Sequence, residues 1–222
     1  MTTIRWQHPL RIRNALGKPR TVLSAMAVVA AAAACAPPFS ELQSARLVGV
    51  GHKEVTASYN TVNAGYQSQS AHVQNEVTAQ AAFGVGANTD IRARFAAINT
   101  ADGSFQALSA GPKFGLVKDA VALYLPVGIG WGGEVESART IVLNPTILAT
   151  RRFDRHAEMT GSMKYYWWLH NTNEPKLFAW NLGLGLSSDL DRWALRPEVG
   201  LLRDIKDSGH NAQFSLGLTI RR

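Results

Sequence analysis

Residues 211–220 alternate strictly between apolar side chains and small or polar ones. Phe214, Leu216, Leu218 and Ile220 share one side of this segment. A period of two is typical of a β-strand with one apolar face. Similar alternation elsewhere predicts ten strands in all, at residues 53–62, 74–86, 90–98, 105–116, 120–131, 140–150, 156–169, 177–187, 193–202 and 211–220. No amphipathic helical pattern follows residue 36, so we expect an all-β domain.

The connections between these segments carry turn chemistry. Clusters of Gly, Asp, Asn and Ser lie at 86–90, 101–104, 117–119, 187–191 and 206–209. This even spacing predicts antiparallel strands in up-and-down order. An even strand number would bring both chain ends to one side of the sheet. The longer connections are expected at the opposite side, at about 63–73, 132–139, 170–176 and 203–210.

Three features favour a barrel in a membrane. Segments of about ten tilted residues suffice to cross the apolar layer of a bilayer. The apolar face carries almost no charge in mid-strand, where a charge would cost about 2–4 kcal/mol. Aromatic residues gather near strand ends, as in the interfacial girdles of membrane barrels. The predicted girdle residues are Trp131, Tyr165, Trp167, Phe178, Trp180 and Trp193. We therefore expect a single antiparallel up-and-down transmembrane β-barrel of about 10 strands (8–10).

The N-terminus has the composition of a secretion signal. Residues 1–20 carry five basic residues and no acid, and residues 22–34 form an apolar run of 13. That run is short for a membrane helix, which needs about 20 residues. The net charge of the whole chain is +7, and it falls to +2 once residues 1–34 are set aside. The basic balance therefore does not indicate a nucleic-acid partner.

The only cysteine, Cys35, directly follows three alanines and precedes Ala36. This stretch resembles a bacterial lipobox, although the lipobox usually has Leu where this chain has Ala32. The resemblance implies cleavage before Cys35 and acylation of its new N-terminus, which would anchor the protein in lipid. An incidental cysteine near an ordinary cleavage site is the alternative. The expected organisation is a cleaved lipoprotein-type signal at 1–34, a tether or lead-in at 35–52, and a barrel at 53–222; residues 47–51 could form a short strand or a plug-like lead-in.

The second face of the predicted strands carries a few charges of both signs. They are Glu54, Glu76, Arg92, Arg94, Lys113, Glu158, Lys164, Arg196 and Glu198. Buried charges are tolerated when they are paired, so this mixture predicts an ion-pair network that closes the barrel lumen. A small conducting pore is the alternative, although ten strands are few for an open channel.

Little in the sequence indicates enzyme chemistry. His170 and Thr172 lie in a stretch that faintly resembles the His-x-Ser-Asn motif of outer-membrane lipid A deacylases. Thr replaces the Ser nucleophile of that motif, and Pro175 indicates a loop. The other histidines are scattered without the spacing of a metal site. We therefore expect no enzyme, no metal and no cofactor.

The pattern as a whole resembles small Gram-negative outer-membrane β-barrels over nearly the entire mature chain. The chain departs from that class at its end, where Arg221 and Arg222 stand in place of the usual terminal aromatic residue. The resemblance implies a monomer in the outer membrane, with membrane lipid and the barrel-assembly machinery as partners. It favours a structural or envelope-interaction role. A small pore or transport protein is one alternative, and a soluble periplasmic lipocalin-like lipid-binding barrel is another.

Overall fold

The computed structural model describes residues 37–222 except 67–68, 102, 133–140, 170–175 and 206–208. The described residues form thirteen strand segments. They are β1 (Lys53–Tyr66), β2 (Gln69–Gly86), β3 (Thr89–Thr100), β4 (Gly103–Val117), β5 (Val121–Tyr124), β6 (Val127–Trp131), β7 (Val142–Leu143), β8 (Thr146–Arg152), β9 (Ala157–Tyr165), β10 (Trp167–Trp168), β11 (Leu177–Leu186), β12 (Trp193–Asp204) and β13 (His210–Arg221). Within these ranges no helix is long and apolar enough to cross a membrane.

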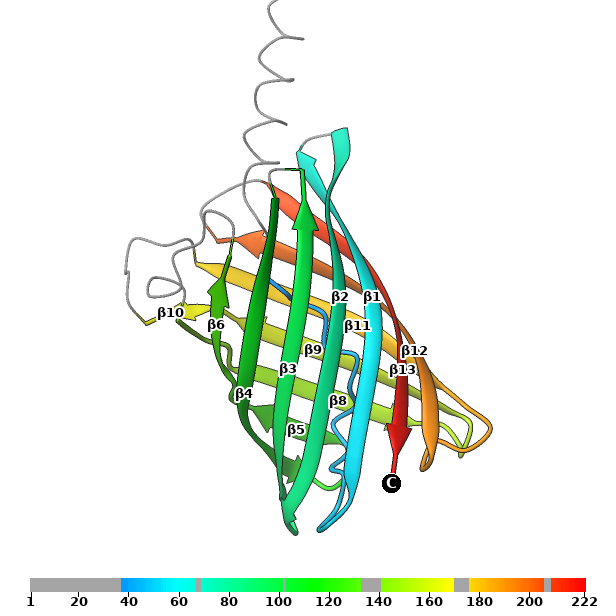
Figure 1. Cartoon of the computed structure of the whole chain (residues 1–222). Helices are drawn as coiled ribbons and strands as arrows, with labels where there is room; N and C mark the ends of the chain where they lie inside the picture. Colours follow the sequence, from blue (N-terminus) through cyan, green and yellow to red (C-terminus); the bar gives the residue numbers. More distant parts are fainter. Residues whose placement is uncertain (1–36, 67–68, 102, 133–140, 170–175, 206–208) are drawn as a thin grey trace, which may run out of the picture.

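The segments close into one antiparallel barrel (Figure 1). Neighbours in the chain pair with each other, and β1 pairs with both β2 and β13, which closes the ring. The pairs β5/β6, β7/β8 and β9/β10 are each one strand with a short interruption, so the described residues form ten strands. The prediction of an all-β, up-and-down barrel of about ten strands is confirmed.

The barrel has two ends that differ in their connections. At the turn end, short turns join β2 to β3, β4 to β5, β8 to β9 and β11 to β12, and Lys53 lies beside Arg222. The opposite end, called the loop end, holds the connections that begin after β1, β3, β6, β10 and β12. Three of the four connections predicted to be longer lie here, and each falls partly outside the described residues.

The predicted long connection at 63–73 is wrong. β1 continues to Tyr66 and β2 begins at Gln69. The inward positions near the end of β1 are apolar, at Val62 and Ala64, whereas the inward positions earlier in this strand are polar. This reversal of polarity and the register shift at Val62 and Asn63 interrupt the alternation along the sequence, so the alternation did not reveal that the two strands continue into a hairpin.

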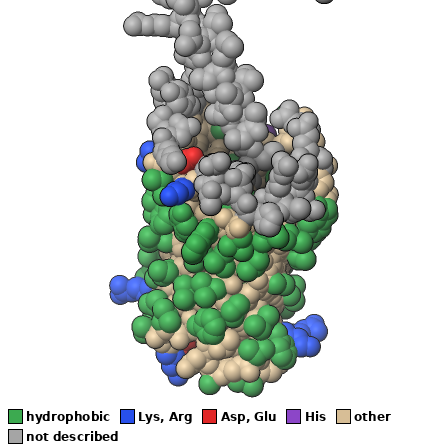
Figure 2. All heavy atoms as spheres, turned by 90° about the vertical axis from the view of Figure 1, so that its left-hand side faces the viewer, with side chains coloured by type: hydrophobic (Ala, Val, Ile, Leu, Met, Phe, Trp, Pro, Cys, Tyr) green, Lys and Arg blue, Asp and Glu red, His purple; other side chains and the backbone are tan. Residues whose placement is uncertain are grey.

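The wall of the barrel is apolar on its outside. Large apolar side chains such as Val55, Phe95, Ile147, Leu182 and Leu218 are exposed. Figure 2 shows a band of hydrophobic side chains around the visible wall, with Lys and Arg side chains toward either end. An apolar surface this continuous is unfavourable in water and is suited to the interior of a bilayer. The soluble alternative, with the apolar face inside, is therefore wrong.

Three neighbouring strands are interrupted at the same level. The interruptions fall at Leu125-Pro126, at Asn144-Pro145 and at Tyr166. Proline has no N–H group and cannot donate to the hydrogen-bond ladder of a sheet. Beyond these breaks, β6 and β7 share two residue pairs, and β7 and β10 share two more. The described wall is thus weakly paired on this side of the loop end.

Candidate functional site

The interior of the barrel contains its own N-terminal segment. Residues 37–52, called the plug, run inside the wall from the loop end to the turn end (Figure 1). Pro38 accepts a hydrogen bond from the hydroxyl of Tyr166 near the loop end, at 2.9 Å. Val50 bridges to Gly84 at the turn end. Residues 39–45 are at most 4 % exposed, so this stretch is a fixed part of the interior.

One carboxylate holds the middle of the plug. The backbone N–H groups of Glu41 and Leu42 each donate to a different oxygen of Glu198, both at 2.8 Å. Leu42 has a φ of 53°, a left-handed conformation that costs a non-glycine residue free energy. Successive N–H groups that converge on one anion form a nest, and hydrogen bonds to a charged acceptor are stronger than neutral ones. The bonds to Glu198 therefore compensate for the strained backbone at Leu42.

Basic side chains of the wall reach the plug at the same level. Lys164 Nζ lies 2.6 Å from Glu41 Oε1. Arg94 donates to the carbonyl and the hydroxyl of Ser40, and its Nη2 lies 3.5 Å from Glu76 Oε2. Lys164 thus links the wall to the plug. Arg94 links its own strand both to the plug and to the neighbouring strand β2. Charges at this depth remain ionised at acceptable cost when they are paired in this way.

Nearer the turn end the wall continues to bind the plug. Lys113 donates to the carbonyl oxygens of Ser44 and Arg46, at 2.6 and 2.9 Å. Arg46 in turn lies 3.6 Å from Glu158 and hydrogen-bonds Asp191 in the turn before β12. Hydrogen bonds from Arg46 and Arg152 hold the pKa of Asp191 below its usual value. The plug is therefore tied at this end to both the wall and a turn.

The remaining charges pair within the wall. Glu54 lies 2.8 Å from Arg92 and 2.6 Å from Arg221, and Arg196 lies 2.8 Å from Glu158. All nine charged residues that the sequence placed on the second face point into the lumen, and each lies within hydrogen-bonding or ion-pairing distance of a partner. Sequence reasoning missed Asp90 and Arg221, although both follow the inward alternation of their strands.

Glycines in the wall leave room for the plug. A Cβ atom on Gly84 would lie 1.8 Å from the carbonyl oxygen of Gly49, a distance that no real contact allows. A Cβ atom on Gly217 would lie 3.4 Å from the side chain of Leu42. The sequence showed these small residues on the inner face, where they suit a crowded lumen. The structure shows that part of the crowding comes from the plug.

A cavity of about 460 Å³ lies above the plug, in the loop-end half of the lumen. Its walls are mostly apolar and include Ala96, Phe105, Val142, Leu177 and Leu202. Gly128 and Gly130 also line it from the weakly paired side of the barrel, and Pro37 and Pro38 line it from the plug. Small-molecule binding sites commonly have volumes of about 300–1,000 Å³. The cavity thus has the size of a binding site.

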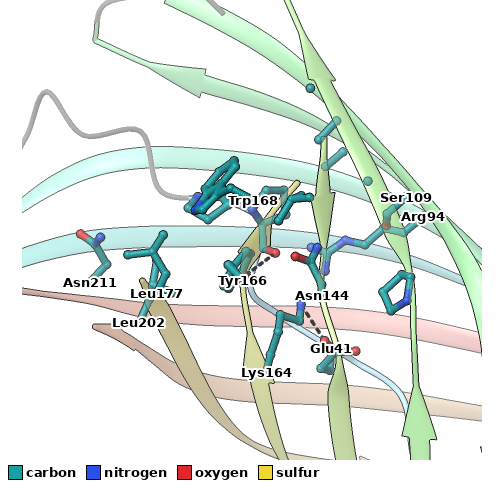
Figure 3. Close-up of a pocket in the computed structure, with 18 of the residues that line it drawn as sticks. Glu41, Arg94, Ser109, Asn144, Lys164, Tyr166, Trp168, Leu177, Leu202 and Asn211 are labelled. Atoms are coloured by element: carbon teal, nitrogen blue, oxygen red, sulfur yellow. Dashed lines mark hydrogen bonds and ion pairs between the residues drawn. The ribbon is translucent and has the colours of Figure 1, made fainter. Parts of the chain in front are cut away.

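Several charged groups of the cavity lining meet on its plug side (Figure 3), whereas Asp204, His210 and Asn211 line it at the loop end. Glu41 and Lys164 form their ion pair there, and the side chains of Arg94 and Asn144 lie beside it. Asn144 is 9 % exposed. Among the described residues, Arg94 Nε and Asn144 Oδ1 have no hydrogen-bond partner. The cavity therefore combines apolar walls with an unsatisfied donor and an unsatisfied acceptor.

The predicted aromatic residues lie at both ends of the wall. Five are near the loop end, where Trp131 packs against Phe95 and Phe178 against Trp180. Trp193 begins β12 at the turn end. Exposed Phe83, Phe114 and Phe153 also lie toward the turn end, although the sequence analysis did not include them.

The remaining predictions from the sequence concern residues outside the described ranges. Residues 1–34, Cys35, His170 and Thr172 lie outside the described residues. Within the described ranges no group of His, Cys, Asp and Glu side chains could hold a metal ion.

The fold and its apolar exterior define the class of protein: this chain is a transmembrane β-barrel of the outer-membrane type. No family model and no curated protein matches the chain.

Solved structures with similar folds include the attachment invasion locus protein Ail of Yersinia pestis, at 12% identity and a TM-score of 0.38, covering 78% of this chain and 99% of Ail. The translocator domain of the autotransporter NalP from Neisseria meningitidis has 10% identity and a TM-score of 0.45, covering 90% and 95%. The N-terminal β-barrel domain of Pseudomonas aeruginosa OprF has 9% identity and a TM-score of 0.31, covering 78% and 99%. The similarity is one of fold.

Proposed function

We propose that this protein is a non-conducting barrel of the bacterial outer membrane with a structural or envelope-interaction role. The observation that supports this function most directly is the plug. Residues 39–45 lie inside the barrel and are bound to wall residues at several depths, among them Glu198, Lys164 and Lys113. Eight strands already form a barrel that side chains can fill, and sixteen or more leave an aqueous channel. Ten strands around a bound segment therefore favour a closed lumen.

The charge network supports the same conclusion. A selective pore needs charged groups that face water and exchange ions. Here Glu54, Glu158 and Glu198 are at most 5 % exposed, and each accepts hydrogen bonds from Arg side chains or from plug N–H groups. We infer that these charges serve to hold the wall and the plug together. A small pore is the competing function, and conductance separates the two.

The experiment compares the full chain with a variant lacking residues 37–48 in planar lipid bilayers. We expect the full chain to be silent and the deletion variant to conduct small ions, because the deletion removes the segment that occupies the lumen. Lys118→Ala, a change in an exposed turn, serves as a control and should stay silent. Steady conductance of the full chain at the level of the deletion variant would show that the plug does not close the barrel.

Acylation of Cys35 is a separate proposal. Cys35 precedes Pro37 by two residues, a chain distance of at most about 7 Å. Metabolic labelling with a fatty acid, compared between the full chain and Cys35→Ala, tests it. Label in both proteins, or in neither, would refute a lipid anchor at this residue.

A further inference from the structure

The loop-end cavity has an interior unlike that of the rest of the barrel. Most inward side chains around residues 41–48 of the plug are charged, hydroxyl or amide groups, beside one apolar cluster at Ala122 and Leu148, whereas the cavity is bordered by Ala96, Phe105, Val142, Leu177 and Leu202. Water inside proteins is stable where it finds two to four polar partners. Most of the surface of this cavity is apolar, and its volume of about 460 Å³ corresponds to roughly 15 water molecules. An apolar occupant would be more stable there than water.

The polar side of the cavity specifies what such an occupant must carry. Among the described residues, the buried atoms Arg94 Nε, a donor, and Asn144 Oδ1, an acceptor, have no hydrogen-bond partner. Figure 3 shows both side chains beside the Lys164–Glu41 ion pair, at one side of the space. An unsatisfied buried polar group costs about 1–3 kcal/mol. A carboxylate can accept a hydrogen bond from Arg94, and a hydrogen bond between two charged groups is stronger than a neutral one.

We propose that the cavity binds a single-chain amphiphile with a terminal carboxyl group, that is, a molecule of the fatty-acid class. The alkyl chain lies among the apolar walls, and the carboxyl group lies against Arg94 and Asn144. This site adds a ligand to the closed barrel proposed above and does not depend on whether the barrel conducts.

The charges around the cavity favour a carboxyl group over an amine. Arg94 and Lys164 line the plug side together with one carboxylate, Glu41, which Lys164 and Gln43 already hold at 2.6 Å. The other carboxylate of the lining, Asp204, ends β12 at the loop end. The second carboxylate near Arg94, Glu76, is not part of the cavity lining. An alkylammonium group at this position would lie against two cations, whereas a carboxylate would have two attractive neighbours.

The neighbouring wall gives such a molecule a short path from the bilayer. Gly128 and Val142, which line the cavity, belong to β6 and β7, and within the described residues these strands share two residue pairs. The interruptions at Pro126 and Pro145 lie directly beside them. Strands with so few shared hydrogen bonds separate at lower cost than the long strands on the opposite side.

The test uses the full chain in lipid vesicles and 11-bromoundecanoic acid, whose bromine quenches tryptophan fluorescence at short range. Trp168 lines the cavity. The part of the quenching that saturates with probe concentration and is absent in Trp168→Phe therefore measures how much of the cavity is occupied. We expect this component in the full chain, and an apparent affinity reduced about tenfold or more in Arg94→Gln, because a hydrogen bond to a charged group is lost. Ala107→Leu, which fills part of the cavity, should reduce the saturable component as well.

Two comparisons can overturn the proposal. The matched control Lys118→Gln changes an exposed turn residue and should bind as the full chain does. A bromoalkylamine of the same chain length should not produce the component that depends on Trp168. Equal quenching by the acid and the amine would show that the polar side chains of the cavity do not discriminate between a carboxyl group and an amine. Quenching unaffected by Trp168→Phe would show that the probe stays in the bilayer.

Discussion

The two halves of the lumen are built in opposite ways. Around the lower plug, inward positions hold charges and small polar groups that bind a chain segment, whereas the loop-end half has apolar walls around a cavity. Within β1, Thr56 and Ser58 point inward at one depth, and Val62 and Ala64 point inward at another. Strand alternation therefore determines which way a side chain points, while depth determines which chemistry is suitable there.

The largest expected effect comes from removing the carboxylate that binds the plug. Glu198→Ala leaves the buried N–H groups of Glu41 and Leu42 without an acceptor, so we expect the free energy of unfolding to fall by about 2–4 kcal/mol. The measurement is the temperature at which the compact band of unboiled protein converts to the unfolded band on SDS gels.

A conservative variant at Glu198 and a control variant at an exposed turn accompany this measurement. Glu198→Gln keeps one carbonyl acceptor and should lose less. Lys118→Ala, at an exposed turn, should convert at the temperature of the full chain. If Glu198→Ala converted at that temperature too, the plug would contribute nothing to the stability of the barrel.

The same substitution in each half should have a different cost. Ala122 is fully buried and packs in one cluster with Ala45 of the plug, so Ala122→Leu should overpack and cost about 1–3 kcal/mol. Ala107 lines the cavity, and Ala107→Leu should change the unfolding free energy by less than about 1 kcal/mol. The same gel assay measures both, and equal losses would mean that the cavity is not free space.

The smallest effect is expected at acid pH, from the ion pair between Asp191 and Arg46. The pKa of Asp191 lies below its ordinary value of 3.8. A lowered carboxyl pKa stabilises the folded state above that ordinary value, and this contribution disappears as the pH falls through the folded pKa. The advantage of the full chain over Asp191→Asn should thus be present at about pH 6 and disappear as the pH falls below 3.8 and through the lowered pKa of the folded state.

Salt provides the control for this effect. The side chain of Asp191 is 57 % exposed, so added salt should shrink the difference between the two proteins at neutral pH. If the difference in stability between the full chain and Asp191→Asn persisted unchanged at acid pH, the carboxylate of Asp191 would not be its source.

The barrel could be predicted because the alternation of apolar and polar residues that marks each strand lies within about ten consecutive residues. Alternation alone gave the ten strands and the inward direction of Glu54, Arg92 and Lys113. The position of the plug could not be predicted in this way, because its backbone is irregular, its contacts join residues as far apart as Leu42 and Glu198, and no periodic pattern marks them. The sequence analysis allowed a plug-like lead-in only at 47–51.

The cavity was hidden for a different reason. Apolar residues such as Ile98 and Phe105 point inward near the loop end, where the pattern of a membrane strand leads one to expect polar groups. The cavity also depends on Asn144 and Tyr166, which lie at interruptions of strands. Contacts of this kind become visible only when the strands are closed into the barrel around the plug.

The direction of the plug constrains the order of assembly. Its first described residues lie at the loop end, and its last residues lead into β1 at the turn end. β1 also pairs with β13, so the ring of described strands closes at a seam between two segments that are far apart in the sequence. A segment that spans the lumen of a narrow barrel is most easily enclosed before β1 and β13 pair. We therefore expect closure to be a late, slow event, because it joins residues far apart in sequence.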